Sequence, residues 1–500
     1  MPRVAKAAKA ARARQSVLLI GSEARPFAKT GGLADVLGAL PSALQRLGWD
    51  ATLVLPRYRG VTAGTLAETF PVTVGGYTRD VGFYEAPLAY GARAVLVDCP
   101  DLYDRDGVYG AQHPGQGDAG GDYPDNARRY AFLTRAALEY AARWKTPPAI
   151  VHAHDWQAGL APVYLKTIYA AHPTLGGIPS VFTIHNLAYQ GLFESDWLPR
   201  LDLGWDQFGV DRLEFYGNIS FLKGGLIDAQ VITTVSRRYA EEIQTPAFGC
   251  AFDGVLRARS GALVGILNGI DTAEWNPASD PALPAPFDAS DLSGKRQAKM
   301  ALLGRYGLTA DEAALARPVV GMVSRMVDQK GFDLIAAAIP SLTRLDATFL
   351  VLGTGDPQYQ DMWRALTARF PERIGARIGF DEALAHLIEA GADVFLMPSR
   401  FEPCGLNQMY SMRYGTVPVV HGVGGLADTV NRSTGFVFED DTPAAMLEAL
   451  TAALTAFRDA RGWRTLQLAG MQQDFSWARS AQEYVKIYRR ALTEGSRLRA

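Results

Sequence analysis

The chain has 500 residues, 48% of them hydrophobic and 20% charged, which is ordinary for a globular protein of more than one domain. The formal net charge of -2 excludes a strong overall field that would recruit nucleic acid or a membrane surface. Three scattered cysteines are too few for a disulfide framework and indicate a reducing compartment, and no stretch approaches the roughly 18 apolar residues of a membrane span.

Residues 1–15 are compositionally biased, with Lys6, Lys9, Arg12 and Arg14 set among alanines. A secretory signal would need an apolar run of about 7–15 residues, which this segment does not contain. The absence of acidic residues leaves a transit peptide as an alternative, although serine is scarce. We expect a solvated basic tail on a cytoplasmic protein.

Short apolar runs alternate with helical patterns from residue 16 onward. Strands are predicted at residues 16–21, 52–55, 94–97, 149–152 and 180–184, and helices at 32–47, 130–143 and 159–170. This alternation is typical of a parallel sheet that is covered by helices on both faces.

A second series of the same kind begins near residue 262. Strands are predicted at residues 319–323, 348–353, 393–397 and 418–420, and helices at 331–339, 359–370, 406–414 and 426–430. Between the two series, residues 276–293 are rich in Pro, Asp, Ala and Ser and predict a linker. The α/β pattern therefore predicts two Rossmann-like, doubly wound lobes, 16–261 and 262–475, that face a cleft. Ligands bind beyond the carboxyl ends of the strands in such sheets, so we expect the active site in the cleft.

The pentapeptide GGLAD occurs twice, at residues 31–35 and 424–428, each time after a strand and at the start of a helix. Paired glycines such as Gly424 and Gly425 let backbone N–H groups approach an anion at the positive end of a helix. Lys29 adds a mobile cation just before the first pair. The P-loop spacing is absent, and no dinucleotide motif G-x-G-x-x-G follows the first predicted strand. An ordinary turn with an exposed lysine is the alternative.

The segment SRMVDQKG, residues 324–331, places Arg325 and Lys330 where a predicted strand ends and a helix begins. A nucleoside diphosphate leaving group gains negative charge as its bond to the sugar breaks. Fixed cations at this position would stabilise the transition state more than the ground state. A solvated basic loop is the alternative.

The segment FEPCGL, residues 401–406, follows another predicted strand. The carboxylate of Glu402 can hydrogen-bond sugar hydroxyls, and Gly405 and Leu406 offer backbone N–H groups to a phosphate. Cys404 raises the alternative of a thiol nucleophile. Because no His or Asn is placed to activate it, we expect a packing residue or a neighbour of the ligand.

Two patterns suggest a metal ion, and we favour a structural reading of both. His152 and His154 lie on one face of a predicted strand, but the sequence offers no matching third ligand. Asp104 and Asp106 form an acid–x–acid pair within a stretch that predicts a polar turn. We therefore expect no metal ion and no cofactor in catalysis.

Seven segments together resemble bacterial glycogen synthases and plastid starch synthases, in order, from about residue 16 to residue 490. They are KTGGLADV (29–36), HAHDWQAGLAPVYL (152–165), FTIHNLAYQG (182–191), GILNGID (265–271), SRMVDQKG (324–331), SRFEPCGLNQMY (399–410) and GGLADTV (424–430). Several of these motifs are long and uncommon, so the resemblance is specific.

The resemblance implies a B-type glycosyltransferase fold in which a final helix, within residues 476–500, crosses back to the first lobe. It implies that glucose passes from ADP-glucose to the non-reducing end of an α-1,4-glucan, glycogen or a maltooligosaccharide, with retention of configuration. It also implies site residues, in four groups: Lys29, Gly32, Arg325 and Lys330 at the diphosphate; Asp155, Glu402 and Cys404 around the sugar; His185 and Asn186 beside the reacting carbon; and Tyr109 and Asn268 at further donor positions. Of these, His185, Arg325, Lys330 and Glu402 are the residues expected to be catalytic.

The sequence departs from related patterns at two positions. Gln157 stands where the family commonly has a histidine. Tyr410 stands where related retaining transferases carry a second glutamate, and a tyrosine at this place is also found in glycogen synthases. A starch synthase, or a synthase using another nucleotide glucose, is the nearest alternative. A catalytically silent glucan-binding relative is the alternative from another class. An NAD-dependent oxidoreductase is disfavoured, because no dinucleotide motif follows the first predicted strand.

Overall fold

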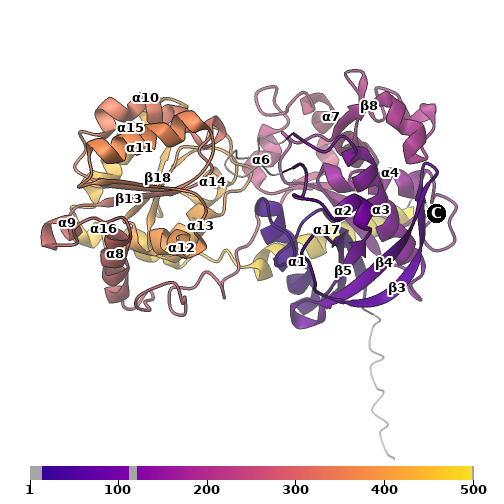
Figure 1. Ribbon diagram of the computed structural model, residues 1–500, viewed down its shortest axis with the longest axis horizontal. Coiled ribbons are helices and arrows are strands. Elements are labelled where there is room, and N and C mark those ends of the chain that lie inside the picture. The colour runs from indigo at the N-terminus through magenta and orange to yellow at the C-terminus, as the bar shows by residue number, and fades with distance from the viewer. Residues whose placement is uncertain (1–13, 112–120, 498–500) are drawn as a thin grey trace, which may run out of the picture.

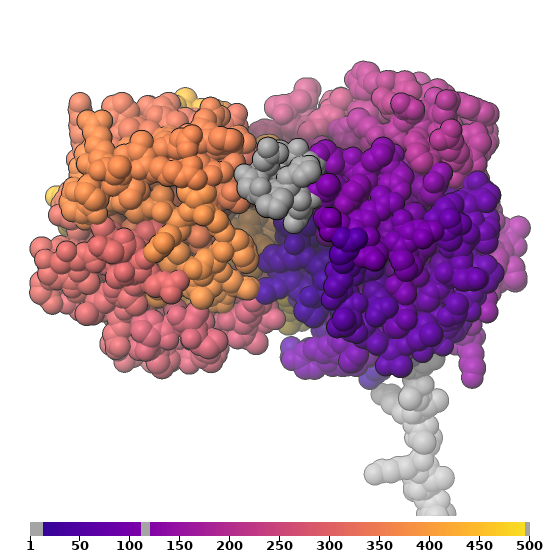
Figure 2. Space-filling model, in the orientation of Figure 1, coloured from indigo at the N-terminus to yellow at the C-terminus, as the bar shows by residue number. Residues whose placement is uncertain are grey.

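The computed structural model describes residues 14–111 and 121–497, which form two α/β lobes side by side (Figure 1). The predicted tail, residues 1–15, therefore lies almost wholly outside the described residues, as do the last three residues of the predicted C-terminal segment. Figure 2 shows the lobes as two masses that meet at an indented waist.

The first lobe is built on a nine-stranded sheet of order β12-β11-β7-β6-β1-β2-β5-β4-β3. Its strands are β1 (Ser16–Ile20), β2 (Asp50–Pro56), β3 (Thr65–Val74), β4 (Tyr77–Pro87), β5 (Arg93–Asp98), β6 (Ile150–His154), β7 (Ser180–Ile184), β11 (Val231–Thr234) and β12 (Leu263–Gly265). The pairings from β12 to β5 are parallel, whereas β4 and β3 add antiparallel strands at one edge.

Helices cover both faces of this sheet because its central strands are apolar on both sides. Leu18 and Ile20 of β1 belong to one hydrophobic core, and Val17 and Leu19 belong to the other. The helices of the lobe are α1 (Gly32–Arg46), α2 (Pro100–Tyr103), α3 (Asn126–Ala142), α4 (Leu160–Lys166), α5 (Phe221–Asp228), α6 (Arg237–Glu242) and α7 (Asp253–Ala258). A small antiparallel sheet of β8 (Leu192–Glu194), β10 (Asn218–Ser220) and β9 (Glu214–Phe215) lies beside them.

The second lobe has a six-stranded sheet in which every pairing is parallel, of order β15-β14-β13-β16-β17-β18. Its strands are β13 (Val319–Val323), β14 (Thr348–Gly353), β15 (Ile374–Ile378), β16 (Val394–Met397), β17 (Val417–His421) and β18 (Phe436–Phe438). Its helices are α8 (Ser293–Arg305), α9 (Glu312–Ala316), α10 (Phe332–Leu342), α11 (Pro357–Arg369), α12 (Glu382–Gly391), α13 (Asn407–Arg413), α14 (Gly424–Thr429), α15 (Pro443–Ala456) and α16 (Ala460–Met471).

The last helix, α17 (Trp477–Arg497), packs against α1 of the first lobe and is the yellow helix there in Figure 1. Trp477, Tyr484 and Tyr488 are buried in the same core as Leu33 and Leu40 of α1. None of the helices within residues 14–111 and 121–497 combines the length and the hydropathy that a membrane crossing needs.

Two sequence predictions need correction. The first sheet is not entirely parallel, because the hairpin of β3 and β4, which the sequence analysis did not predict, extends it with antiparallel strands. The predicted boundary after residue 261 also falls too early. The strand Leu263–Gly265 pairs with β11 and belongs to the sheet of the first lobe.

Candidate active site

The predicted site residues lie on loops that follow the carboxyl ends of strands. In each sheet the strand order reverses at one strand, so that connections leave it toward both edges of the sheet. In the first sheet β1 lies between β2 and β6, and in the second β13 lies between β14 and β16. Such switch points are where α/β sheets bind ligands. In chain order, the loops carry Lys29 and Gly32 after β1, Asp155 after β6, His185 and Asn186 after β7, Asn268 after β12, Arg325 and Lys330 after β13, Glu402, Cys404, Gly405 and Leu406 after β16, and Gly424 and Gly425 after β17.

Asp155 adopts a strained backbone conformation at the end of β6, with φ 55° and ψ -177°. Its Oδ1 accepts the backbone N–H of His185 at 2.7 Å, which joins the loops after β6 and β7. Burial raises the pKa of Asp155 to about 7, although hydrogen bonds from the backbones of His185 and Asn186 oppose the rise. The carboxyl group is therefore held in a fixed position at the edge of the sheet.

His185 is buried, and its ring is hydrogen-bonded to a second histidine. The distance from His185 Nε2 to His154 Nδ1 is 2.9 Å, so one ring donates and the other accepts. Burial lowers the pKa of His185 to about 3 and lowers the pKa of His154 as well. His185 is thus a neutral hydrogen-bonding group of fixed orientation.

His152 continues this buried network toward the C-terminal helix. Its ring lies 4.0 Å from that of His154, which confirms that the two share a face. Its Nδ1 is 2.8 Å from the hydroxyl of Tyr488, and its Nε2 is 2.7 Å from Thr183 Oγ1. Both ring nitrogens of His152 are engaged within the core, which supports the structural reading of this histidine pair.

The acid–x–acid pair is also structural. Arg59 donates from Nε to Asp104 Oδ1 at 2.6 Å and also contacts Asp106. All three side chains are exposed. The arrangement is a surface ion pair at a turn, in agreement with the polar turn that the sequence predicts.

Glu23 is a candidate site residue that the sequence analysis missed. Its side chain is buried and accepts the backbone N–H groups of Thr30 and Gly31 in the loop that carries Lys29, and it also bonds Tyr109. Burial raises the pKa of Glu23 despite these hydrogen bonds. The available signal was its place directly after the buried run SVLLIGS, at the carboxyl end of β1.

Tyr109 and Lys29 flank this glutamate. The hydroxyl of Tyr109 lies 2.8 Å from Ser22 Oγ, and Lys29 Nζ lies 2.8 Å from Asp35 Oδ1 on α1. Lys29 keeps a side chain that is 41% exposed, so it remains available to an anion.

In the second lobe, Lys330 and Glu402 form an ion pair with Nζ and Oε2 2.5 Å apart. Ser399 Oγ donates to the same carboxylate oxygen at 3.1 Å. Arg325 lies nearby in sequence and contacts Gln329, with Nη2 to Oε1 at 3.4 Å. Lys330, which the sequence predicts to bind the diphosphate, is therefore paired with Glu402, which it predicts to bind the sugar.

Cys404 is buried, and burial raises the pKa of its thiol to about 12, against opposing hydrogen bonds from Asn268. A thiol with so high a pKa is a poor nucleophile. This supports the packing reading of Cys404 and places Asn268 beside it.

The comparisons with known proteins cover nearly the whole chain. The model of the starch synthase catalytic domain matches residues 16–258, and that of glycosyl transferases group 1 matches residues 317–456. A glycogen synthase from Koribacter versatilis is 46% identical over 95% of this chain and 98% of its own length. One from Anaeromyxobacter dehalogenans (strain 2CP-C) is 48% identical over 95% and 99%. The chain belongs to the glycogen and starch synthase family.

A solved structure extends the same relationship. The catalytic domain of starch synthase IV from Arabidopsis thaliana, bound to ADP and acarbose, has a TM-score of 0.86 and 32% identity, covering 96% of this chain and 99% of that chain. Together these findings confirm the predicted fold, two Rossmann-like lobes of the B-type glycosyltransferase class. The protein is accordingly a glycosyltransferase of the glycogen and starch synthase family.

This member of the glycogen and starch synthase family joins its lobes through contacts between α6 and α14, which face each other at the centre of Figure 1. Gly424 has φ 46°, and a Cβ there would lie 1.9 Å from the carbonyl oxygen of Glu402, so only glycine fits. Its N–H donates to both carboxylate oxygens of Glu242, at 3.0 and 3.1 Å. Ser236 Oγ donates to the carbonyl of Pro403 at 2.6 Å. The N–H that the sequence assigned to a donor anion is therefore bonded to a carboxylate of the other lobe.

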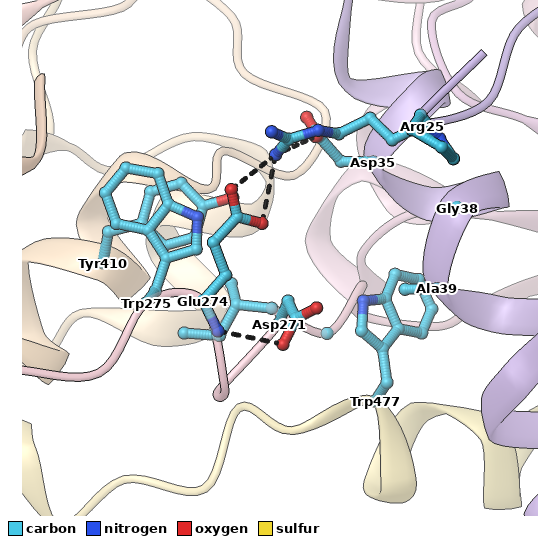
Figure 3. A pocket seen from close by; sticks show the side chains of 12 residues that line it. Arg25, Asp35, Gly38, Ala39, Asp271, Glu274, Trp275, Tyr410 and Trp477 are labelled. Carbon is cyan, nitrogen blue, oxygen red and sulfur yellow. Dashed lines mark hydrogen bonds and ion pairs between the residues drawn. The ribbon is translucent and has the colours of Figure 1, made fainter. Parts of the chain in front are cut away.

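A second junction between the lobes forms a half-open cavity of about 250 Å³ (Figure 3). Its lining includes Arg25 and Asp35 from the first lobe and Tyr410 from the second. Tyr410, one of the two departures noted in the sequence, stacks on Trp275 with ring centroids 3.7 Å apart. None of the predicted site residues lines this cavity, although Lys29 bonds Asp35, which does.

Proposed function

We propose that the protein is a glycogen synthase that transfers glucose from ADP-glucose to the non-reducing end of an α-1,4-glucan, with retention of configuration, in the cytoplasm. The observation that supports this most directly is the near full-length similarity to glycogen synthases, at 46–48% identity for the two relatives described above. The structurally similar starch synthase IV is bound to ADP and acarbose, which supports a nucleotide donor and a glucan-like acceptor.

In this proposal, cations from both lobes bind the donor diphosphate. Arg325 and Lys330 approach it from the second lobe and Lys29 from the first. Glu402 and Asp155 accept hydrogen bonds from glucose hydroxyls, and neutral His185 bonds the sugar near the reacting carbon.

Retention requires either a covalent glycosyl intermediate or attack from the face of the leaving group. Asp155 is already fixed by backbone N–H groups, and Glu402 is held by Lys330 and Ser399. Both carboxyl groups are thus better placed to grip hydroxyls than to act as a nucleophile. We therefore favour front-face attack. The acceptor hydroxyl oxygen forms a bond to the anomeric carbon, the bond from that carbon to the β-phosphate oxygen breaks, and the departing ADP takes the acceptor proton.

The deciding experiment measures the incorporation of radiolabelled glucose into glycogen from ADP-glucose and UDP-glucose in parallel assays. We expect incorporation from ADP-glucose, a lower rate from UDP-glucose, and loss of both in Lys330→Ala. Equal or faster incorporation from UDP-glucose would assign a different donor. Binding of glycogen without incorporation from either donor would identify a silent glucan-binding relative instead.

A further inference from the structure

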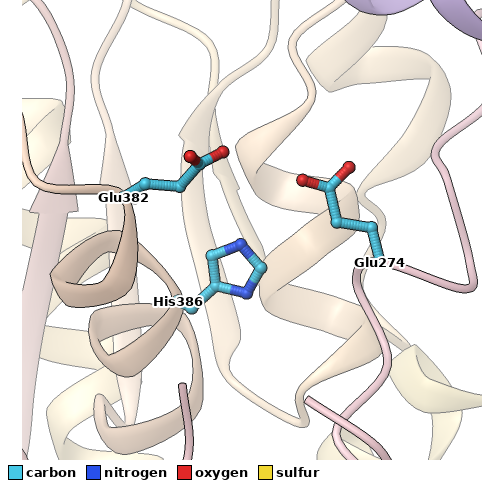
Figure 4. Close-up of side chains that lie close together, drawn as sticks. All are labelled: Glu274, Glu382 and His386. Atoms are coloured by element: carbon cyan, nitrogen blue, oxygen red, sulfur yellow. The ribbon is translucent and has the colours of Figure 1, made fainter. Parts of the chain in front are cut away.

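Three side chains with metal-binding chemistry converge where the two lobes meet: Glu274, Glu382 and His386 (Figure 4). Each offers one ligand atom, and these atoms all lie within 4.8 Å of one another. Glu382 and His386 occupy positions i and i+4 of α12, so they project from the same face of the helix. Glu274 approaches them from the chain segment between the lobes.

His386 is prepared to accept a ligand at one nitrogen. It is buried, and its Nδ1 lies 2.7 Å from Asp280 Oδ2, which also accepts the hydroxyl of Tyr414 at 2.5 Å. Because Nδ1 is held by the carboxylate of Asp280, Nε2 is the ring nitrogen left to bind a ligand. A carboxylate behind the imidazole is the usual arrangement of a metal-binding histidine.

The free nitrogen points at the two glutamates. In Figure 4 the imidazole of His386 directs one nitrogen between the carboxylates of Glu382 and Glu274. No hydrogen bond joins His386 Nε2 to any other residue within 14–111 and 121–497. Trp275 stacks on the ring at 3.8 Å and 13°, which fixes its orientation. A buried ring therefore presents an unused lone pair to two carboxylates.

Arg25 shows that this cluster attracts a cation. Its Nη1 pairs with Glu274 at 2.9 and 3.1 Å, and its Nη2 pairs with Glu382 at 2.8 Å. A guanidinium has donors only, so it satisfies the carboxylates but uses no nitrogen lone pair. It also brings a single positive charge to the carboxylates of Glu274 and Glu382. A third carboxylate lies close by, since Asp35 Oδ1 is 3.6 Å from Arg25 Nη1. A divalent cation would balance the two carboxylate charges and bind all three ligand atoms, whereas Arg25 does neither.

We propose that Glu274, Glu382 and His386 form a binding site for a divalent transition metal of the zinc class, which takes the place of Arg25. One imidazole nitrogen and two carboxylate oxygens are a ligand set for such ions, with water completing the shell. Two ligands of one tetrahedral ion lie about 3.4 Å apart, so ligand atoms that are now up to 4.8 Å apart must move closer by up to about 1.4 Å. The two glutamate side chains are 33% and 49% exposed and have room for that movement.

The proposal does not rest on the proposed function, because none of the three ligands belongs to the residues assigned to the donor or the glucan. Its consequence is structural. Arg25 comes from the loop of the first lobe, and Glu382 from the second. A metal ion that displaces Arg25 would break this ion pair between the lobes.

The test titrates the full-length protein, free of any polyhistidine tag, with Co²⁺ followed by its visible absorption and with Zn²⁺ followed by calorimetry. We expect one site per chain, bound about tenfold more tightly by Arg25→Gln, because the competing ion pairs are lost. Asp280→Asn should bind about 10–100-fold more weakly than the native protein. Arg296→Gln, which breaks the exposed pair with Glu312, is the matched control and should bind as the native protein does.

Two variants decide whether these residues are the ligands. On the Arg25→Gln background, His386→Gln and Glu382→Gln should each abolish the Co²⁺ absorption of the site. Glu382 is exposed at the surface, so its variant tests the proposal even where the buried His386 variant does not fold. Absence of stoichiometric uptake by Arg25→Gln at millimolar metal, or uptake that survives Glu382→Gln unchanged, would overturn the proposal.

Discussion

At the scale of single residues, the candidate site is arranged as opposed charges that already contact one another. Lys330 and Glu402 form an ion pair in which the lysine side chain is 20% exposed and the glutamate side chain 8%. A diphosphate that arrives at Lys330 offers a second anion to the same ammonium, while a sugar hydroxyl can donate to Glu402. In this proposal the pair holds both side chains in position before the donor binds, so little reorganisation accompanies the reaction.

Replacing the cations of the second lobe should slow turnover more than it weakens binding. The front-face route loads charge onto the departing ADP, and removing one preorganised donor of this kind typically lowers the rate by about 10²–10³. Arg325→Ala and Lys330→Ala should each reduce kcat by at least that factor, and Arg325→Lys should not restore it fully because the planar fork is lost. The measurement is kcat and KM for ADP-glucose, with Lys486→Ala on the exposed face of α17 as control. A raised KM with unchanged kcat would refute the leaving-group role.

The carboxyl group of Asp155 should make stability depend on pH. Burial raises its folded-state pKa to about 7, whereas an aspartate in an unfolded chain has a pKa near 4. The folded state therefore keeps a proton that the unfolded state releases, and the stability contributed by this group falls as pH rises from about 4 to 7. Between pH 5 and pH 8, we expect the ligand-free native protein to lose about 2–3 kcal/mol relative to Asp155→Asn, which cannot ionise. Thermal unfolding of both proteins at the two pH values measures this, and parallel pH profiles would contradict it.

At the scale of elements, the turn from β13 into α10 places Arg325 and Lys330, and it depends on one glycine. Gly331 has φ 75°, and a Cβ there would lie 2.0 Å from the carbonyl oxygen of Pro398 at the end of the neighbouring strand. The close approach of these two loops is what sets Lys330 beside Glu402. A side chain at residue 331 would force them apart.

Gly331→Ala should therefore lower both stability and activity. Backbone strain and the clash together predict a loss of at least about 2 kcal/mol, with a lower kcat because Lys330 moves. Gly304→Ala is the matched control, since this glycine lies inside α8 and its added Cβ would meet no atom within 4 Å. The control should gain about 0.5–1 kcal/mol of helix stability. Equal melting temperatures for the two variants would show that the turn tolerates a side chain.

The sequence predicts the secondary-structure elements better than it predicts the contacts that the candidate site makes. The strands at 180–184, 319–323 and 348–353 match the predictions at both ends, because a strand buried on both faces is a continuous apolar run. The sequence analysis missed the hairpin of β3 and β4 although its second half carries a signal, since buried Phe70, Val72 and Val74 alternate with exposed Pro71 and Thr73. The sequence was enough to place most motif residues of the site at the ends of strands, because most of the motifs follow a predicted strand. The contact between Glu242 and Gly424 could not, because 182 residues separate them and only the packing of the lobes joins them.

At the scale of the whole molecule, the site is divided between two lobes that touch at a few places. Asp155 and His185 belong to the first lobe, and Arg325 and Lys330 belong to the second. The contact of α6 with α14 includes hydrogen bonds from the backbone N–H of Arg237 to Asp428 at 2.6 Å, besides those of Gly424. Such a small set of polar contacts can serve as a pivot, because rotation about it requires few of them to break.

We accordingly expect the lobes to close when donor product and acceptor bind. No single lobe completes the proposed site, so the free energy of binding both ligands favours the arrangement that brings its two halves together. Small-angle scattering should show a smaller radius of gyration with ADP and a maltooligosaccharide than without ligands. Lys330→Ala, which removes a diphosphate cation, should show a weaker change at the same ADP concentration. Superimposable curves for the native protein at saturating ligand would mean that the described arrangement already binds both substrates, and the catalytic roles would then have to be met without movement of the lobes.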